Sequence, residues 1–194
     1  METLAWMQAK LPEFLKDLEA FVRRESPSKD LKGLAEAAAF LEEAFGPLKG
    51  RLSRKDTPLG PILLLKREGD GAPVLVLCHY DTVHPRGSFP EPFRLERDRA
   101  VGPGVYDMKG GIVALLYALR YAEATGRKLP PLEILFTPDE EIGSKESRPL
   151  IEAAARKARA ASGSPWASLS KKPRSRLRAS SARERERGWS PKRG

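Results

Sequence analysis

The sequence of 194 residues is poor in cysteine, in histidine and in long apolar runs. Its single cysteine, Cys78, cannot form a disulfide within the chain. No apolar run approaches the roughly 18 residues of a membrane-spanning helix, and the first residues, among them Glu2 and Lys10, lack the apolar core of a secretory signal. We therefore expect a soluble, cytoplasmic protein without a membrane partner. The two histidines, His79 and His84, belong to one stretch, so no other part of the chain supplies an imidazole.

Helical and strand patterns alternate along the first four fifths of the chain. Apolar residues recur either at helical spacing or in short runs bounded by glycine and proline. The patterns predict helices at 4–24, 28–45, 111–124 and 145–159, and strands at 50–56, 61–67, 73–78 and 132–137. Helices that alternate with apolar strands are typical of the α/β class, so we expect a mostly parallel central sheet flanked by helices.

The C-terminal segment differs in composition from the rest of the chain. Residues 156–194 contain 13 lysines and arginines against 2 acids, a net charge of +11, whereas residues 1–155 carry a net charge of −2. The segment is rich in Arg, Ser, Pro and Ala, and such a composition cannot bury enough apolar surface to order itself. We expect a folded part at 1–155 and a disordered basic tail at 156–194.

An imidazole and a carboxylate stand two positions apart at the end of a predicted strand. His79 and Asp81 come directly after the apolar run at 73–78. In α/β sheets, ligands bind outside the carboxyl ends of the strands. A lone histidine at such a place is more often a hydrogen-bonded structural residue than a metal ligand, so this stretch by itself leaves both interpretations open.

Two acidic clusters follow at corresponding places in the sequence. Asp107 lies among the glycines of 102–111, and Glu140 and Glu141 lie within 137–144. An adjacent glutamate pair alone is usually a solvated turn. The joint occurrence of three such stretches favours a hydrolase site in which carboxylates and an imidazole hold two divalent ions.

The stretches 79–83, 102–111 and 137–144 together resemble the M20 family of metallopeptidases in their order and spacing. The resemblance extends to 25–30 and 147–152, and it looks closest to the glutamate carboxypeptidase branch. It implies a metal-dependent hydrolase that cleaves the amide bonds of peptides or N-acyl amino acids. The implied cofactors are two divalent metal ions, with zinc as the expected metal, and the implied partner is a small peptide or N-acyl amino acid substrate.

The resemblance also implies a role for each residue of the site. His79, Asp107 and Glu141 would bind metal, with Asp107 bridging the two ions. Asp81 would accept a hydrogen bond from the other ring N–H of His79, which fixes the tautomer. Glu140 would be the general base that takes a proton from water and passes it to the leaving amine. The adjacent glutamates can divide these roles only on irregular backbone, because successive side chains on a strand point to opposite faces.

Neighbouring residues carry further expectations. The resemblance implies a cis peptide bond between Asp107 and Met108. Cys78, at the end of an apolar strand, is expected to be an inert core residue. His84 is expected to serve the loop or to contact substrate rather than to bind metal. Lys109 is expected either to partner nearby acids or to have a functional role, and the sequence does not separate the two.

Members of the M20 family use further ligands that this sequence lacks. The resemblance implies another acidic ligand downstream of the glutamate pair and a distal histidine, but 164–168 contains no carboxylate and His84 is the last histidine. We interpret the chain as a truncated, inactive catalytic domain without the dimerisation domain of its full-length relatives, and its tail as a frameshift product.

The alternative is a non-enzymatic fragment whose basic tail binds nucleic acid or another polyanion through its positive charge. The tail offers only Trp166 and Trp189 for stacking on bases, so nucleic acid is not the expected partner.

Overall fold

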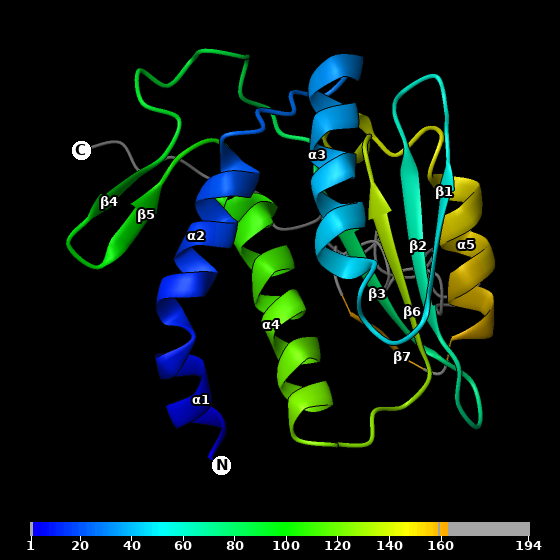
Figure 1. Cartoon of the computed structure of the whole chain (residues 1–194). Helices are drawn as coiled ribbons and strands as arrows, with labels where there is room; N and C mark the ends of the chain where they lie inside the picture. The colour runs from blue at the N-terminus through cyan, green and yellow to red at the C-terminus, as the bar shows by residue number, and fades with distance from the viewer. Residues whose placement is uncertain (1, 159, 163–194) are drawn as a thin grey trace, which may run out of the picture.

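A computed structural model of the chain describes residues 2–158 and 160–162 (Figure 1). Its main feature is a five-stranded sheet in the order β1-β2-β6-β3-β7, with helices on both faces. The strands are β1 (Arg51–Lys55), β2 (Ile62–Arg67), β3 (Val74–His79), β6 (Leu132–Thr137) and β7 (Ala160–Ser162). The helices are α1 (Thr3–Ala9), α2 (Leu11–Val22), α3 (Leu31–Phe45), α4 (Gly110–Ala124) and α5 (Arg148–Lys157), and a separate hairpin consists of β4 (Arg94–Glu96) and β5 (Arg99–Val101).

The sheet is mixed in direction. β3 pairs in parallel with β6 and β7, whereas β2 pairs antiparallel with both β1 and β6. The predicted α/β class and the central sheet between helices are confirmed, with the parallel part confined to three strands. The short connection at 56–61 accounts for the antiparallel pairing of β1 with β2, because a parallel pair needs a crossover of a dozen or more residues, whereas a hairpin does not.

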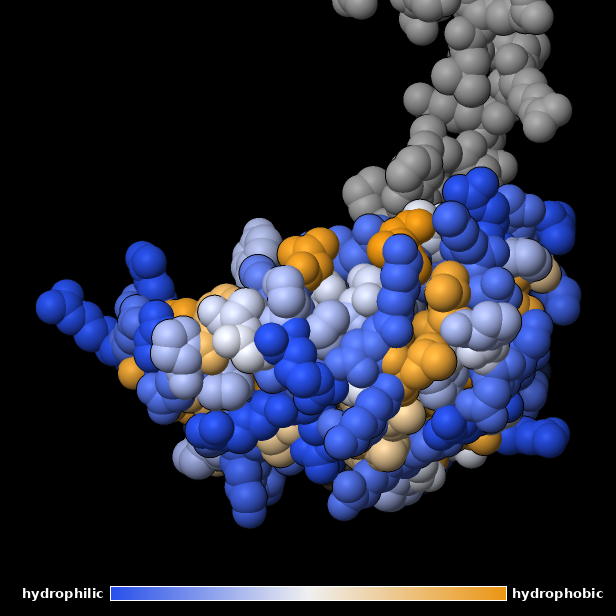
Figure 2. Space-filling view, turned by 90° about the horizontal axis from the view of Figure 1, so that it is seen from above, coloured by the Kyte–Doolittle hydropathy of each residue, from blue (hydrophilic) through white to orange (hydrophobic). Residues whose placement is uncertain are grey.

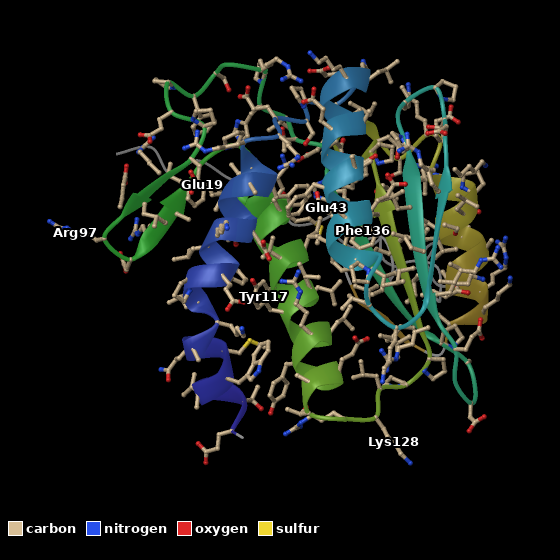
Figure 3. All side chains as sticks on the ribbon, viewed as in Figure 1. Glu19, Glu43, Arg97, Tyr117, Lys128 and Phe136 are labelled. Atoms are coloured by element: carbon tan, nitrogen blue, oxygen red, sulfur yellow. The ribbon has the colours of Figure 1, made fainter. Side chains whose placement is uncertain are left out.

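Alternate residues of the central strands face two separate apolar clusters. Ile134 and Phe136 of β6 pack in the larger cluster with α2, α3 and α4, whereas Leu135 packs in the smaller cluster beside α5. Phe136 points from β6 toward α3, where its ring meets that of Phe45 edge-on at 4.8 Å between centroids (Figure 3). This alternation is the period of two expected for a strand that is buried on both faces.

The N-terminal helical segment differs from its prediction. A single helix at 4–24 is wrong, because the chain turns at Lys10 and forms α1 and α2. The cause is Pro12 in the first turn of α2, which lacks an N–H and whose ring clashes with the carbonyl four residues earlier in a continuous helix. The next helix begins at Leu31 rather than at 28, since the Asp30 side chain caps it by accepting from the Gly33 amide.

Regular structure continues beyond residue 155, where the predicted tail begins. α5 ends at Lys157, and β7 pairs with β3 through Val74 and Ala160. The remainder of the predicted tail, 163–194, lies outside the described residues, so its disorder stays a prediction. In the part of the chain that the structure describes, no helix is both long enough and apolar enough to cross a membrane.

The carboxyl ends of β3 and β6 lie side by side, and this brings two of the sequence clusters together. His79 stands opposite Thr137 in the parallel register, and the Tyr80 amide donates to the Thr137 carbonyl at 3.0 Å. Asp81 therefore follows β3 at the same level at which Asp139 follows β6. Figure 2 looks down on this end of the molecule, where the surface is mostly hydrophilic and hydrophobic residues form small separate patches.

Candidate metal centre

The three predicted metal ligands converge from three separate segments. His79 ends β3, Asp107 lies in the short element η1 (Val105–Lys109), and Glu141 lies in the one-turn helix η2 (Glu140–Ile142). One ligand atom from each lies within 4.8 Å of the other two. His79 Nε2 is 2.9 Å from Asp107 Oδ1. His79 is buried, whereas the Asp107 side chain is 68 % exposed, so the cluster lies at the protein surface.

The His79 ring is oriented by Asp81. Nδ1 lies 3.2 Å from the main-chain oxygen of Asp81 and 3.4 Å from its carboxylate oxygen Oδ1. The ring therefore faces Asp81, and the shorter of the two contacts is to the main chain rather than to the carboxylate expected from the sequence. With Nδ1 engaged, Nε2 is the nitrogen that points toward Asp107.

The Asp81 carboxylate has a second set of contacts that the sequence analysis missed. It is fully buried, and it accepts hydrogen bonds from the main-chain amides of Glu140 and Glu141, each at 3.2 Å. The Ser28 hydroxyl donates to the same carboxylate at 2.8 Å. Asp81 therefore holds the backbone on which the glutamate pair stands, in addition to the His79 ring.

The backbone after β6 is irregular, as the division of roles between the two glutamates requires. Glu140 and Glu141 lie in a turn of 3-10 helix that ends at Gly143, whose φ of 91° is in the left-handed region that favours glycine. The fully buried carboxylate of Asp139 closes the loop by accepting from the amides of Glu146 at 2.7 Å and Ser147 at 3.3 Å.

Asp107 lies on a tightly turned segment. Gly104 has a φ of 72°, and a Cβ at this position would come within 2.6 Å of a methyl group of Thr82, so the turn requires glycine. The amide of Lys109 donates to the Gly104 carbonyl at 2.8 Å, which closes the turn around Asp107. The peptide bond between Asp107 and Met108 is cis, as the resemblance implied.

The clustered carboxylates set the electrostatics of the site. Burial lowers the pKa of His79, but the hydrogen bond and charge of Asp81, together with Asp107 and Glu140, outweigh it, so the pKa rises to about 9. Burial raises the pKa of Glu141 above its ordinary value; the neighbouring carboxylates add to this effect, and His79 opposes it. The site is therefore an environment that favours a bound cation.

The structure also shows the surroundings of three further residues near the site, Cys78, His84 and Lys109. Cys78 is buried in the core, and burial raises the pKa of its thiol to about 12, which fits the inert packing role. The His84 ring packs edge-on against Phe89 at 5.2 Å, and His84 is not part of the three-residue cluster. Lys109 is fully buried and donates to main-chain carbonyls. Burial lowers the pKa of its amine to about 7, and the charge of nearby Glu25 opposes this effect.

The fold is similar to those of solved peptidases. Human carnosine dipeptidase 1 superposes with a TM-score of 0.73 at 19% sequence identity, over 82% of this chain and 40% of that chain. An M20 family metallo-carboxypeptidase from Sulfolobus solfataricus superposes with a TM-score of 0.67 at 25% identity, over 78% of this chain and 37% of that chain. The first likeness concerns the fold alone.

Comparison of the sequence with known proteins identifies the family. Residues 75–173 match Peptidase family M20/M25/M40. Carboxypeptidase G2 of Pseudomonas sp. (strain RS-16) is 36% identical over 147 residues, which are 73% of this chain and 35% of that protein. The chain belongs to peptidase family M20/M25/M40, and thus to enzymes of the metallopeptidase type. It spans about a third of the length of carboxypeptidase G2.

Proposed function

We propose that this chain supplies part of the active site of a metal-dependent hydrolase that acts on the amide bonds of peptides or N-acyl amino acids. The observation that carries the proposal is the convergence of His79, Asp107 and Glu141 within 4.8 Å, although 62 positions separate the first from the last. The 36% identity to carboxypeptidase G2 supports a carboxypeptidase-like activity, in line with the glutamate carboxypeptidase branch that the sequence resembles.

The residues present fit a divalent ion. One imidazole nitrogen and two carboxylate oxygens form a donor set that zinc accepts. A hydrogen-bonded second ring nitrogen, as His79 has with Asp81, is typical of metal-binding histidines. We propose that this site would hold two zinc ions, with His79, Asp107 and Glu141 as ligands, and that Asp107 would be the ligand the two ions share, as the family resemblance implies. Ions held by His79, Asp107 and Glu141 would supply Lewis acidity to the carbonyl of the scissile amide and would lower the pKa of water.

Glu140 is the proposed general base. Its main-chain amide is fixed by Asp81, and the helical turn separates its side-chain direction from that of Glu141. In this role the Glu140 carboxylate takes a proton from the attacking water. It then passes the same proton to the amide nitrogen as the C–N bond breaks, so the leaving group departs as a neutral amine.

Asp81 is proposed to act through other residues. Its contacts to the His79 ring, to the Glu140 amide and to the Glu141 amide mean that one buried carboxylate positions a ligand, the base and a second ligand. A carboxylate behind a ligating imidazole also raises the basicity of that ligand.

The three candidate ligands found among residues 2–158 and 160–162 are fewer than two ions require. The family resemblance implies a second histidine ligand from a distant part of the chain. Both histidines of this sequence lie at 79–84, which supports the proposal that this chain alone is inactive. The frameshift origin of the tail stays a prediction. The single, buried cysteine supports the proposed cytoplasmic location.

Zinc calorimetry on the full chain tests the site. We expect weak zinc binding that Asp107→Ala abolishes. The matched control is Asp98→Ala, which removes an exposed carboxylate from the turn between β4 and β5 and should leave zinc binding unchanged. Zinc binding that is indifferent to Asp107→Ala would disprove the proposed ligand set, and so would an equal loss in both variants.

A further inference from the structure

The most deeply buried amine of the described residues belongs to Lys109, which none of the proposed steps uses. Its side chain has no exposed surface. Lysine is rarely buried in this way, because removing an ammonium group from water costs much free energy unless polar partners replace the water. The contacts of Lys109 therefore require an explanation.

The partners of Lys109 are two main-chain carbonyls, that of Phe21 in the last turn of α2 and that of Arg24 two residues beyond that helix. Nζ donates to the main-chain oxygen of Arg24 at 2.8 Å and to that of Phe21 at 3.4 Å, and it lies 5.1 Å from the centre of the Phe21 ring. The last carbonyls of a helix have no partner within the helix, and the helix dipole makes this end negative. The Phe21 carbonyl also accepts from the Arg24 amide at 3.2 Å, so the Arg24 carbonyl is the stronger partner of Lys109. Lys109 thus caps the C-terminal end of α2 from a distant part of the chain.

The same residue closes the turn that carries Asp107. The Lys109 amide bonds the Gly104 carbonyl, and the next amide, that of Gly110, bonds the Val105 carbonyl. Asp107 lies between these two hydrogen bonds. The main chain of Lys109 therefore shapes the turn, and its side chain fixes the turn to α2.

A purely structural role for this lysine is a weaker explanation. An apolar side chain of similar length fills such a site without the desolvation penalty, and replacing buried charges by apolar residues is often neutral or stabilising. Methionine has the appropriate length and lacks donors. Lys109→Met therefore separates the anchoring hydrogen bonds from simple packing.

We propose that Lys109 is a positioning residue of the candidate metal centre, which holds Asp107 in place by anchoring η1 to the C-terminal carbonyls of α2. This rests on the proposed function only in taking Asp107 as a metal ligand. The anchor itself can be measured without metal.

The first measurement is hydrogen exchange on the metal-free full chain. We expect Lys109→Met to accelerate exchange of the amides at 105–111 by about tenfold or more, because the turn loses its attachment to α2. The control is Leu119→Ala, a core substitution farther along α4, the same helix that follows η1. It should lower the melting temperature without selective acceleration at 105–111.

The second measurement is a cobalt titration followed by visible absorption, with Co²⁺ as the probe. We expect Lys109→Met to weaken Co²⁺ affinity about 10–100-fold and to alter the cobalt spectrum, as when a partner that orients a metal ligand is lost. Leu119→Ala and Lys128→Met should keep the wild-type affinity. Lys128 is exposed beyond the far end of α4, and it provides the same chemical change away from the site (Figure 3).

The outcomes separate the two proposals. Wild-type exchange at 105–111 in Lys109→Met would overturn the anchor, and so would an equal loss of affinity in Leu119→Ala. A wild-type chain that binds no Co²⁺ would overturn the proposed metal site, while the exchange result would still decide the anchor. If Lys109→Met does not fold, Lys109→Gln keeps an N–H donor on a shorter stem, and the same two measurements apply to it with the same expected direction.

Discussion

The replacement Asp81→Asn tests whether the buried carboxylate both orients the His79 ring and holds the backbone of the glutamate pair. The Asp81 oxygens accept from the amides of Glu140 and Glu141 and from the Ser28 hydroxyl, and one of them lies 3.4 Å from His79 Nδ1. Asparagine keeps the shape and one acceptor oxygen, but it replaces the other oxygen with an NH₂ donor. That donor then faces a main-chain N–H or the His79 ring.

The expected magnitude follows from these contacts. A hydrogen bond to a charged group contributes about 1.5–3 kcal/mol, and Asp81→Asn removes at least one and weakens the others by removing the charge. We therefore expect the free energy of unfolding of the metal-free chain to fall by about 2–4 kcal/mol. Zinc affinity should fall about 10–100-fold in addition, because the imidazole loses its orienting carboxylate.

Urea unfolding of the metal-free chain and zinc calorimetry measure the two effects separately. The matched control is Asp70→Asn, in the exposed turn between β2 and β3, which should stay within about 0.5 kcal/mol of wild type. An Asp81→Asn variant with wild-type stability would show that these hydrogen bonds do not hold the glutamate loop. A stability loss with unchanged zinc affinity would leave Asp81 as a loop anchor only.

Two further predictions concern the glutamate pair and the cap of α3. Glu141→Gln should weaken zinc binding strongly in calorimetry while Glu140→Gln leaves it near wild type, and in an active protein that contains this segment Glu140→Gln should lower turnover about 10²–10⁴-fold; equal zinc affinities for the two variants would contradict the assignment. The pKa of Asp30 is lowered by the Gly33 amide, against the effect of burial, and lowered further by Arg86. Because a depressed pKa stabilises the fold above the ordinary value near 3.9 and the effect disappears as the pH falls through the folded value, Asp30→Asn should cost up to about 1 kcal/mol at neutral pH and nothing in acid. Urea unfolding at neutral and acidic pH decides this, and a larger difference in acid would have the wrong sign.

Much of the fold was predictable because its signals are local. The apolar runs at 73–78 and 132–137 became β3 and β6 with little shift, since buried strands read as continuous apolar stretches. The placement of β6 between β2 and β3 was not predictable, because the sequence does not state which strands pair. The break at Lys10 had a local signal in Pro12, and the helical periodicity on both sides of it concealed that signal.

The candidate site divides in the same way. His79, Asp107 and Glu141 could be named from residue types after strands and from the family resemblance, and their ligand atoms do lie together. The supports of these residues could not be named. The Ser28 contact to Asp81 and the Lys109 contact to Arg24 join residues 53 and 85 positions apart, and such contacts depend on how the elements pack.

The two ionisable side chains buried beneath the site, Asp81 and Lys109, are both held by main-chain partners. Asp81 accepts hydrogen bonds from main-chain N–H groups, and Lys109 donates hydrogen bonds to main-chain carbonyls. A main-chain partner is fixed to a helix or a turn, whereas an oppositely charged side chain would have to be held in place itself. An opposite charge would also neutralise the carboxylate, and the charge of Asp81 would then no longer act on His79. Each of the two buried groups thus locks one ligand-bearing segment, η2 or η1, to the fold through main-chain partners.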